Sequence, residues 1–477
     1  MGPSSTIYLD NSATTRVRNE VLQAMEPFQT DCWGNASSRH GVGRKSRQAI
    51  DHARKQVASL IGATANEIFF TPCATYSNNV ALLGHARYVE ENGLGRHIIT
   101  SGIEHSSVLG PVKYLQSRGW DVTTLNVDWQ GFIDLDELLR EIRPQTSMIS
   151  IMWGNNEIGT LQPIEQIAAI AAEREIFFHT DAVQVAGKLP IDVLSTRVDT
   201  LSLSGHKFHA PKGIGVLYIR NGVQVLPLMF GGGQESGLFP GTENVANIVG
   251  LGKAAELADT ELAAADLSAV DAVDLSEDLQ SDDQRTSHTR SRLTRIQELL
   301  IAKLSQHTNI RFTGARDLSR RVPGHISVTV DGAIGSDICD DAYEQGICIS
   351  SVSACSSNGG HPSHVLKALG LSEKQALGSV RISAGWFNTE AECELAADIL
   401  SGLVAQHAQQ AQPARNPQNL QDPQHVQQDP RDILSAPPAF SNAPLAVTPK
   451  PELHLVPNHI ARRRIDRARH AARTSAL

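Results

Sequence analysis

Short apolar runs alternate with helical patterns from Thr6 to Arg220, and this alternation restricts the chain to few folds. A helical pattern such as Arg44 to Ile61 is followed by an apolar run that is too short for a helix. The runs are His97 to Thr100, Met148 to Trp153, Ile176 to Phe178, Thr200 to Leu203 and Val216 to Ile219. Strands separated by helices form βαβ units, so the sequence predicts an α/β fold with a mostly parallel sheet buried on both faces.

Composition divides the chain into four parts. We expect a large α/β domain over residues 1–260, an acidic insertion over 261–290, a smaller α+β domain over 291–405, and a tail over 406–477. The insertion is predicted to be a solvated helix or surface segment because its Asp and Glu residues have little opposite charge nearby. The tail is rich in Pro and Gln, which predicts disorder, and it ends in the basic segment Ile460 to Arg473. We expect that end to be solvated, with an acidic partner or a nucleic acid as the alternative.

The smaller domain has its own series of predicted elements. Its last helix is expected to open at Thr389, where Glu392 three residues later completes a capping box. The earlier elements are a helix around Ser291 to His307, a strand Ile326 to Val330, a helix around Ile338 to Gln345, and strands near Ile347 and Val380.

Bulk composition fits a soluble enzyme. Hydrophobic residues make up 41% of the 477 residues, and no stretch approaches the roughly 20 apolar residues of a membrane span. Residues 1–15 contain no apolar signal core, so we expect a cytoplasmic protein without membrane contact. A net charge of -9 gives no overall basic surface, so we expect no nucleic-acid partner. The six cysteines form no Cys-x-x-Cys pair, and we expect neither disulfides nor a zinc site.

Polar residues follow each apolar run, and in a parallel sheet such residues meet at one edge. Hydroxyls, amides, imidazoles, carboxylates and one amine are therefore expected to converge there. They occur in the segments Thr71 to Thr75, Glu104-His105, Asn155 to Glu157, His179 to Gln184 and Ser204 to Lys207.

These residue types match the needs of pyridoxal 5'-phosphate (PLP). Its aldehyde requires an amine, which Lys207 can supply just beyond an apolar strand. Its pyridine nitrogen requires a carboxylate, which Asp181 can supply. Hydroxyl, imidazole and backbone N–H groups suit its phosphate, while an imidazole can stack on the ring and amides can reach its phenolic oxygen. We assign Thr75, Ser204 and His206 to the phosphate, His105 to the ring face, and Gln184 and Asn156 to the phenolic oxygen.

A series of short polar motifs runs along the chain in a characteristic order. They are Tyr8 to Thr15, Gly34 to His40, Glu104-His105, Asn155 to Gly159, His179 to Gln184, Ser204 to Lys207, Pro240 to Asn244 and Ser350 to Cys355. On these motifs the chain, from about Ile7 to Leu403, resembles the NifS/IscS-like group I cysteine desulfurases, which have the class V aminotransferase fold. The resemblance implies a type I PLP-dependent transferase fold with a seven-stranded sheet, in which the N-terminal segment packs on the smaller domain.

Roles for single residues follow from this resemblance. Lys207 is the Schiff-base lysine, and His105 also moves protons. Asn35 and Arg381 would hold the substrate carboxylate, for which an arginine provides a bidentate grip. The remaining cofactor residues are Ala74 and Thr75, Asn156, Asp181, Gln184, Ser204 and His206, and Thr242, which reaches the phosphate of the neighbouring subunit in a homodimer.

Cys355 is the implied sulfur acceptor. It lies in the Ser/Gly/Asn-rich segment Ser350 to Gly360, and a mobile loop suits a thiol that attacks the substrate and then carries sulfur outward. The predicted reaction converts L-cysteine to L-alanine and a Cys355 persulfide, which passes to a sulfur acceptor for iron–sulfur cluster assembly or thiolation. No resident metal is implied, and Cys355 would ligate an iron–sulfur cluster only during transfer to a scaffold protein.

Two other functions remain open on the sequence. One is a selenocysteine lyase or another PLP lyase on the same fold, and the other is a degenerate, non-catalytic scaffold. Cys339, Cys348 and Cys393 are expected to be small buried residues. The chain departs from the family pattern at Cys73, Tyr76, Ser236, Phe239 and Val352. Ser236 and Phe239 replace arginines, so we predict weaker cofactor retention.

Overall fold

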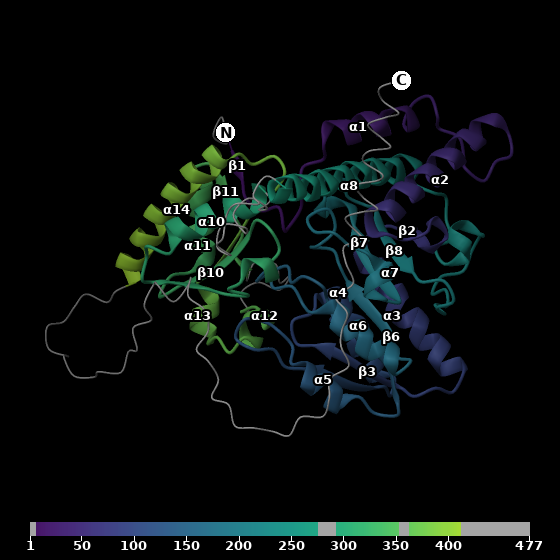
Figure 1. Ribbon diagram of the computed structural model, residues 1–477, viewed down its shortest axis with the longest axis horizontal. Coiled ribbons are helices and arrows are strands. Elements are labelled where there is room, and N and C mark those ends of the chain that lie inside the picture. Colours follow the sequence, from purple (N-terminus) through teal and green to yellow (C-terminus); the bar gives the residue numbers. More distant parts are fainter. Residues whose placement is uncertain (1–5, 275–291, 353–361, 412–477) are drawn as a thin grey trace, which may run out of the picture. The chain divides into compact units, whose positions relative to one another are not determined.

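A seven-stranded sheet is the main sheet of the computed structural model, which describes residues 6–274, 292–352 and 362–411 (Figure 1). Its strand order is β2-β8-β7-β6-β5-β3-β4, and the neighbouring strands from β7 to β4 are parallel. The predicted α/β fold with a mostly parallel sheet is therefore confirmed. The strands are β2 (Ile68–Thr71), β3 (His97–Ser101), β4 (Asp121–Leu125), β5 (Thr146–Ser150), β6 (Phe177–Asp181), β7 (Thr200–Ser204) and β8 (Gly215–Ile219).

One strand of the predicted series runs against the others. β8 pairs antiparallel with both β7 and β2. Residues 205–214 connect β7 to β8, and a parallel crossover needs roughly a dozen residues or more, usually with a helix. The chain therefore turns back directly after β7, and this turn contains Lys207.

Helices cover both faces of the sheet. Successive strand residues point to opposite sides, so each face has apolar side chains that a layer of helices buries. Ile98 and Met148 pack with helices α3 and α4 on one face, while Ile99 and Ile149 belong to the larger core on the other face. That larger core includes residues of α2, α6 and α8. The helices are α2 (Gly41–Ile61), α3 (Ala74–Glu91), α4 (Ser106–Ser117), α6 (Ile164–Glu173) and α8 (Val245–Asp274).

The C-terminal part of the described chain has a separate core. The three-stranded antiparallel sheet β12-β10-β9 packs with α10, α11 and α14, and β1 (Ile7–Tyr8) pairs in parallel with β11 beside them. The elements of this part are α10 (Arg292–Leu304), β9 (Ile310–Phe312), β10 (His325–Val330), α11 (Gly335–Glu344), β11 (Ile347–Cys348), α12 (His364–Ala368), α13 (Glu373–Leu377), β12 (Ser379–Ser383) and α14 (Glu390–Ala411).

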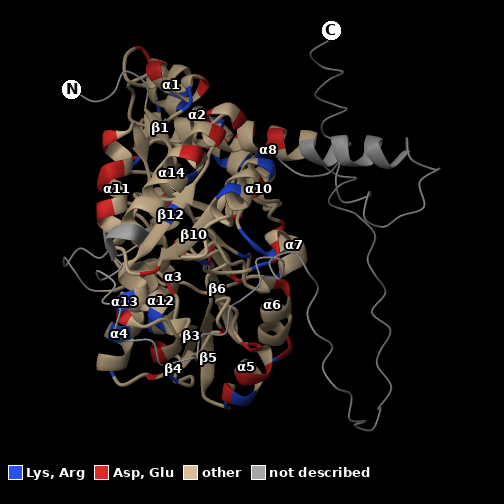
Figure 2. Cartoon of the chain, turned by 90° about the vertical axis from the view of Figure 1, so that its left-hand side faces the viewer, with Lys and Arg blue, Asp and Glu red and all other residues tan. Residues whose placement is uncertain are grey.

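The predicted start of the last helix is confirmed. The Thr389 backbone N–H donates to the Glu392 carboxylate at 2.9 Å, and the Thr389 hydroxyl accepts from the Glu392 N–H at 3.2 Å. Helix α14 continues past residue 405 to Ala411. Acidic residues recur along α11 (red in Figure 2), and the carboxylate of Asp341 on this helix lies 2.8 Å from His407 Nε2 of α14.

Two compact units divide the chain. The first comprises Met1–Leu262 and Arg290–Ala411 and contains both cores, and the second comprises Ala263–Thr289 and Gln412–Leu477. Of the second unit the structure describes only the end of α8, so most of the predicted acidic insertion and the tail lie outside the described residues. Within the described residues, no helix is long and apolar enough to span a membrane. The remaining helices are α1 (Asn19–Met25), α5 (Leu135–Glu141) and α7 (Val193–Thr196).

Candidate active site

The amine of Lys207 is held against the N-terminal segment. Strand β7 ends at Ser204, and the 3₁₀ turn Gly205–Lys207 follows directly, so Lys207 lies at the carboxyl edge of the sheet. Its Nζ atom donates to the carbonyl oxygens of Ser12 and Ala13 at 2.6 and 2.7 Å. The two motifs that contain these residues, far apart in sequence, therefore meet at one point.

The Asp181 carboxylate is fixed by an amide that sequence reasoning missed. Asn78 in α3 donates from Nδ2 to Asp181 Oδ2 at 2.8 Å. The Asn78 Oδ1 atom then faces His179 Nε2 at 3.0 Å, and His179 Nδ1 faces the Thr200 hydroxyl at 2.8 Å. Burial lowers the pKa of His179 to about 3, so the ring is neutral and carries its proton on Nε2, where the amide oxygen accepts it. The orientation of the Asn78 amide is thus determined from both sides.

His105 belongs to the same hydrogen-bond network. It is the N-cap of α4, and its Nδ1 atom lies 2.8 Å from the Ser107 hydroxyl, which accepts from Asn78 Nδ2 at 2.8 Å. The surrounding protein atoms lower the pKa of His105, although its side chain is partly open to solvent, and the Asp181 carboxylate opposes this by raising it. Since Nδ1 also accepts from the Ser107 N–H at 3.2 Å, the neutral ring presents its Nε2–H.

Gln184 is also fixed at both ends of its amide. Its Nε2 atom donates to the Ser12 carbonyl at 3.0 Å, the same oxygen that accepts from Lys207. Its Oε1 atom accepts from Lys188 at 3.3 Å. The residue is buried, and one N–H of its amide remains for a further acceptor.

The start of helix α3 provides unpaired backbone donors. Cys73 occupies the N-cap position without a side-chain cap, and the N–H groups of Ala74 and Thr75 donate to no group in the described part of the chain. Such a helix start is suited to an anion. His206 follows the end of β7, its Nδ1 atom lies 3.1 Å from the Thr14 hydroxyl, and burial, ahead of the nearby Lys207, lowers its pKa to about 4. A neutral imidazole can donate to a phosphate without carrying charge itself.

Arg381 is buried in strand β12 at the boundary between the two cores. Its guanidinium donates to the Asp10 carboxylate at 2.8 Å and to the Asn156 carbonyl at 3.0 Å, while its Nε atom is buried with no partner among the described residues. Its backbone N–H donates to the Ser350 carbonyl at 2.7 Å. The structure thus brings Arg381 and Asn156 together. Through Ser350, Arg381 is also bound to the residues that precede the segment that contains Cys355.

Two predicted residues have no contact with this network. Asn35 is exposed before α2, where its side chain accepts from the Ser37 N–H at 2.8 Å. Thr242 is exposed in the loop before α8. No hydrogen bond within the described residues joins either side chain to Lys207, Asp181 or Arg381.

Cys355 lies outside the described residues, but both flanking segments are described. Val352 is buried against Ile103 and Met152, and the Ser363 hydroxyl donates to the Glu157 carboxylate. His364 Nε2 lies 3.0 Å from the Glu104 carbonyl, next to His105 in sequence. The segment that contains Cys355 is therefore anchored at both ends beside the network.

The other thiols in the C-terminal part are poor nucleophiles. Burial raises the pKa of Cys339 to about 12 and that of Cys393 to about 11, and it also raises the pKa of Cys348. Cys393 is buried as predicted, whereas Cys339 and Cys348 are only half-buried, so the prediction for these two was too strong.

Glu104 is a fully buried acid beneath the network. Its Oε1 atom accepts from the Ser101 hydroxyl at 2.7 Å and from the Met152 N–H at 2.9 Å. Its Oε2 atom has no partner in the described part of the chain. Burial raises the pKa of Glu104 to about 8, and the Asp181 charge adds to this, so the carboxyl is mostly protonated at neutral pH.

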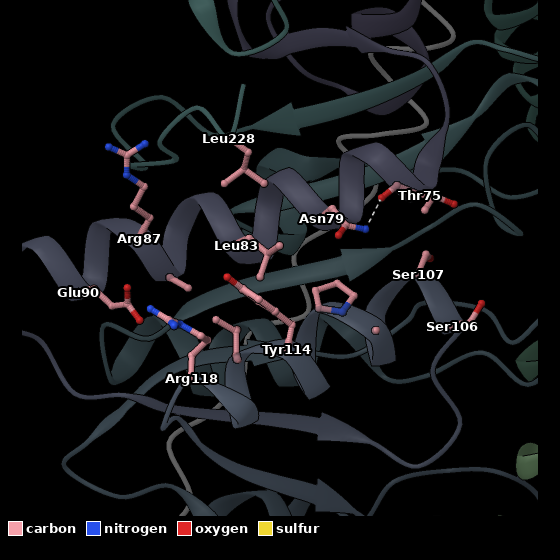
Figure 3. Close-up of a pocket in the computed structure, with 14 residues that line it drawn as sticks. Thr75, Asn79, Leu83, Arg87, Glu90, Ser106, Ser107, Tyr114, Arg118 and Leu228 are labelled. Atoms are coloured by element: carbon pink, nitrogen blue, oxygen red, sulfur yellow. Dashed lines mark hydrogen bonds between the residues drawn. The ribbon is translucent and has the colours of Figure 1, made fainter. Parts of the chain in front are cut away.

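A cavity of about 720 Å³ lies between α3 and α4, at the edge of the network (Figure 3). Thr75 and Ser107 line one end, and Arg87 and Glu90 line the other. Lys207 and Asp181 do not line it. The cavity therefore reaches the site at the N-terminal end of α3.

Comparison with known proteins fits this geometry. The family model described as "Aminotransferase class-V" matches residues 7–395. The chain belongs to the class-V aminotransferase family. A relative named cysteine desulfurase IscS, from Dictyoglomus turgidum, is 40% identical over 399 residues, which cover 83% of this chain and 94% of the relative.

Solved structures give the same assignment. A NifS-like protein aligns with a TM-score of 0.73 at 35% identity and covers 84% of this chain and 99% of its own. SspA in complex with cysteine aligns with a TM-score of 0.65 at 37% identity and covers 79% of this chain and 98% of its own. Class-V aminotransferases depend on PLP. The groups at this site of the chain fit that cofactor: an amine at Lys207, a carboxylate at Asp181 and free N–H groups at the start of α3.

The residues that sequence reasoning missed support the predicted ones. Asn78 lies three and four positions after Thr75 and Ala74, so it occupies the same face of α3, and this spacing could have indicated it. Ser107 could have been recognised from the first turn of α4. The carbonyl oxygens of Ser12 and Ala13 could not, because backbone acceptors leave no trace in side-chain identity.

The departures from the family pattern have different surroundings. Phe239 and Val352 are each buried in an apolar cluster, so both make packing contacts in place of the expected arginine and glycine. Tyr76 is exposed in the first turn of α3. Ser236 has a left-handed backbone with φ of 57°, which is uncommon for a residue other than glycine.

Proposed function

We propose that this protein is a PLP-dependent cysteine desulfurase, which converts L-cysteine to L-alanine and leaves the sulfur as a persulfide on Cys355. One observation carries the proposal: the Lys207 amine, the amide-supported Asp181 carboxylate and the free N–H groups of α3 all lie at one edge of the sheet. Similarity to proteins named cysteine desulfurase over 83% of the chain supports the choice of reaction.

The chain's own residues would bind PLP at three points. Lys207 would form the covalent bond, Asp181 would pair with the pyridine nitrogen, and the amides of Ala74 and Thr75, with Ser204 and His206, would hold the phosphate. When bound, the cofactor supplies an electron-withdrawing ring that stabilises negative charge on the substrate carbons. Asn78 keeps the Asp181 carboxylate in place, so no reorganisation is needed when charge develops.

His105 is placed to hold and deliver a proton. Its neutral ring carries a proton on Nε2, while Nδ1 accepts hydrogen bonds from the hydroxyl and the N–H of Ser107. A proton accepted by this ring makes it a cation, which can give a proton back from Nε2 and return to the neutral form. Gln184 and Asn156 would position the phenolic side of the cofactor; the Gln184 amide has one N–H available for that contact.

Arg381 and Cys355 would act on the substrate itself. The Arg381 guanidinium would bind the substrate carboxylate, with Asn35 as a second contact. The Cys355 thiolate would attack the substrate sulfur, so that an S–S bond forms and the C–S bond breaks. The electron pair of the broken bond stays on carbon, where a proton completes the methyl group of alanine.

The active form is proposed to be a homodimer. Thr242 is exposed and has no hydrogen bond to the other site residues of its own described chain, so its proposed phosphate contact would be made across to a second subunit. The persulfide would then pass to a sulfur-acceptor or iron–sulfur scaffold protein. These assignments are consistent with the exposure of Thr242 and the anchored ends of the Cys355 segment.

The test is alanine release from L-cysteine by purified protein loaded with PLP, in parallel with detection of the persulfide by mass spectrometry. Cys355→Ser should abolish alanine formation and the persulfide, whereas Cys348→Ser, in a half-buried thiol, should keep both. Activity of Cys355→Ser on L-selenocysteine with none on L-cysteine would indicate a selenocysteine lyase instead. Absence of turnover in wild-type protein with bound PLP would refute the proposal.

A further inference from the structure

Lys188 is a second amine beside the candidate active site, and neither the family comparison nor the proposed mechanism gives it a role. It lies seven residues after the end of strand β6, and its Nζ atom lies 3.3 Å from Gln184 Oε1. Its side chain is partly buried. No carboxylate of the described residues pairs with it.

The Lys188 amine is influenced by the positive charges of other site residues. Burial lowers the pKa of Lys188 to about 7, and the charges of Lys207 and Arg381 add to the effect. His209 and His325 are close enough for the Lys188 charge to lower their own pKa values. Electrostatic repulsion is mutual, so a charged Lys188 also acts against a second positive charge on Lys207.

The contact with Gln184 determines which way its amide points. A lysine amine that carries its proton can only donate, so it selects Gln184 Oε1, and the Ser12 carbonyl can only accept, so it selects Nε2. The same Ser12 oxygen accepts from Lys207 at 2.6 Å. A continuous chain of hydrogen bonds therefore runs from Lys188 through Gln184 and Ser12 to Lys207.

We propose that Lys188 is a positioning residue of the cofactor site, which fixes the Gln184 amide and, in its protonated form, disfavours protonation at Lys207. This inference rests on the proposed function, since it concerns the lysine that would bind PLP. Lys188 touches no reacting atom in this account. Its effect is electrostatic and orientational.

The experiment measures the pH midpoint of the visible absorption band of the lysine-bound cofactor in full-length protein loaded with PLP. Lys188→Met removes the charge, so protonation becomes easier and the midpoint should rise by roughly half a pH unit or more. Lys188→Arg keeps a permanent charge, so its midpoint should equal that of the wild type or lie below it. Lys113→Met, at an exposed position of α4, is the matched control and should leave the midpoint unchanged.

A rise of the midpoint in the Met variant without a rise in the Arg variant distinguishes a charge effect from a structural one, which would move both variants the same way. Thermal unfolding checks that Lys188→Met folds, and Lys188→Gln, which is polar but uncharged, replaces it otherwise. An unchanged midpoint in the folded uncharged variant overturns the inference and leaves the proposed function intact. Wild-type protein without any visible band, or a band that persists in Lys207→Ala, overturns both.

Discussion

The Asn78 amide nitrogen lies 2.8 Å from an oxygen of the Asp181 carboxylate, and both groups are buried. The same nitrogen lies 2.8 Å from the Ser107 hydroxyl, which faces His105. One amide on α3 thus connects the carboxylate that would support the cofactor ring with the imidazole that would move protons. A buried carboxylate that loses such a donor pays a desolvation cost, so this contact should be measurable in cofactor binding.

Asn78→Ala should weaken PLP binding about tenfold, because a hydrogen bond to a charged group contributes about 1.5 kcal/mol or more. The dissociation constant is measured by titrating apoprotein with PLP and following the visible band. Asn92→Ala, at the exposed C-terminal end of the same helix, is the control and should bind as the wild type does. Equal affinity in Asn78→Ala would show that the Asp181 carboxylate needs no support from the amide.

Glu104→Gln should change how stability depends on pH. The pKa of Glu104 is raised to about 8 in the folded protein, so between about pH 4.5 and 8 the folded state holds a proton that the unfolded state has lost. This acid therefore lowers the free energy of unfolding as the pH rises through that range, by at most about 1.4 kcal/mol per pH unit. The glutamine variant lacks the titration, so its stability relative to wild type should increase from pH 5 to pH 8. Urea unfolding at several pH values measures this, and parallel curves would contradict it.

Much of this fold could be predicted because apolar runs and helix signals are local. The apolar run Ile176 to Phe178 indicated β6, although this strand continues to Asp181, and the capping box at Thr389 was readable from neighbouring residues. The antiparallel direction of β8 was not, because it depends on the short connection after β7 rather than on strand composition. The amide of Asn78 and the carbonyl of Ser12 were missed since their importance arises from contacts between segments distant in sequence.

Two inactive variants should restore activity when they form mixed dimers. If Thr242 serves the neighbouring subunit, a dimer of one Lys207→Ala chain and one Thr242→Ala chain contains one intact site. Co-refolded or co-expressed mixtures should contain up to about half as many intact sites as the wild type. How close they come to this value depends on the fraction of mixed dimers. Alanine release by the tag-purified mixed dimer measures this. Activity no higher than that of separately purified variants would place Thr242 outside a shared site.

The wild-type protein should retain its cofactor less well than a variant with the arginine that is usual for the family at position 236. Ser236 is uncharged and lies in a left-handed turn in the loop that leads to Thr242, so positive charge for an anion is reduced there. Extended dialysis of PLP-loaded protein should therefore lower the visible absorbance, and Ser236→Arg should slow the loss. Complete retention by the wild type would refute the prediction.

The central claim, that Lys207 is the lysine bonded to PLP, has a direct chemical test. Borohydride treatment of the PLP-loaded wild-type protein, followed by proteolysis and mass spectrometry, locates the lysine that carries the reduced cofactor. The account predicts a pyridoxyl group on the peptide that contains Lys207 and none on the peptide that contains Lys188. Labelling at Lys188, or no labelled lysine at all, would contradict it.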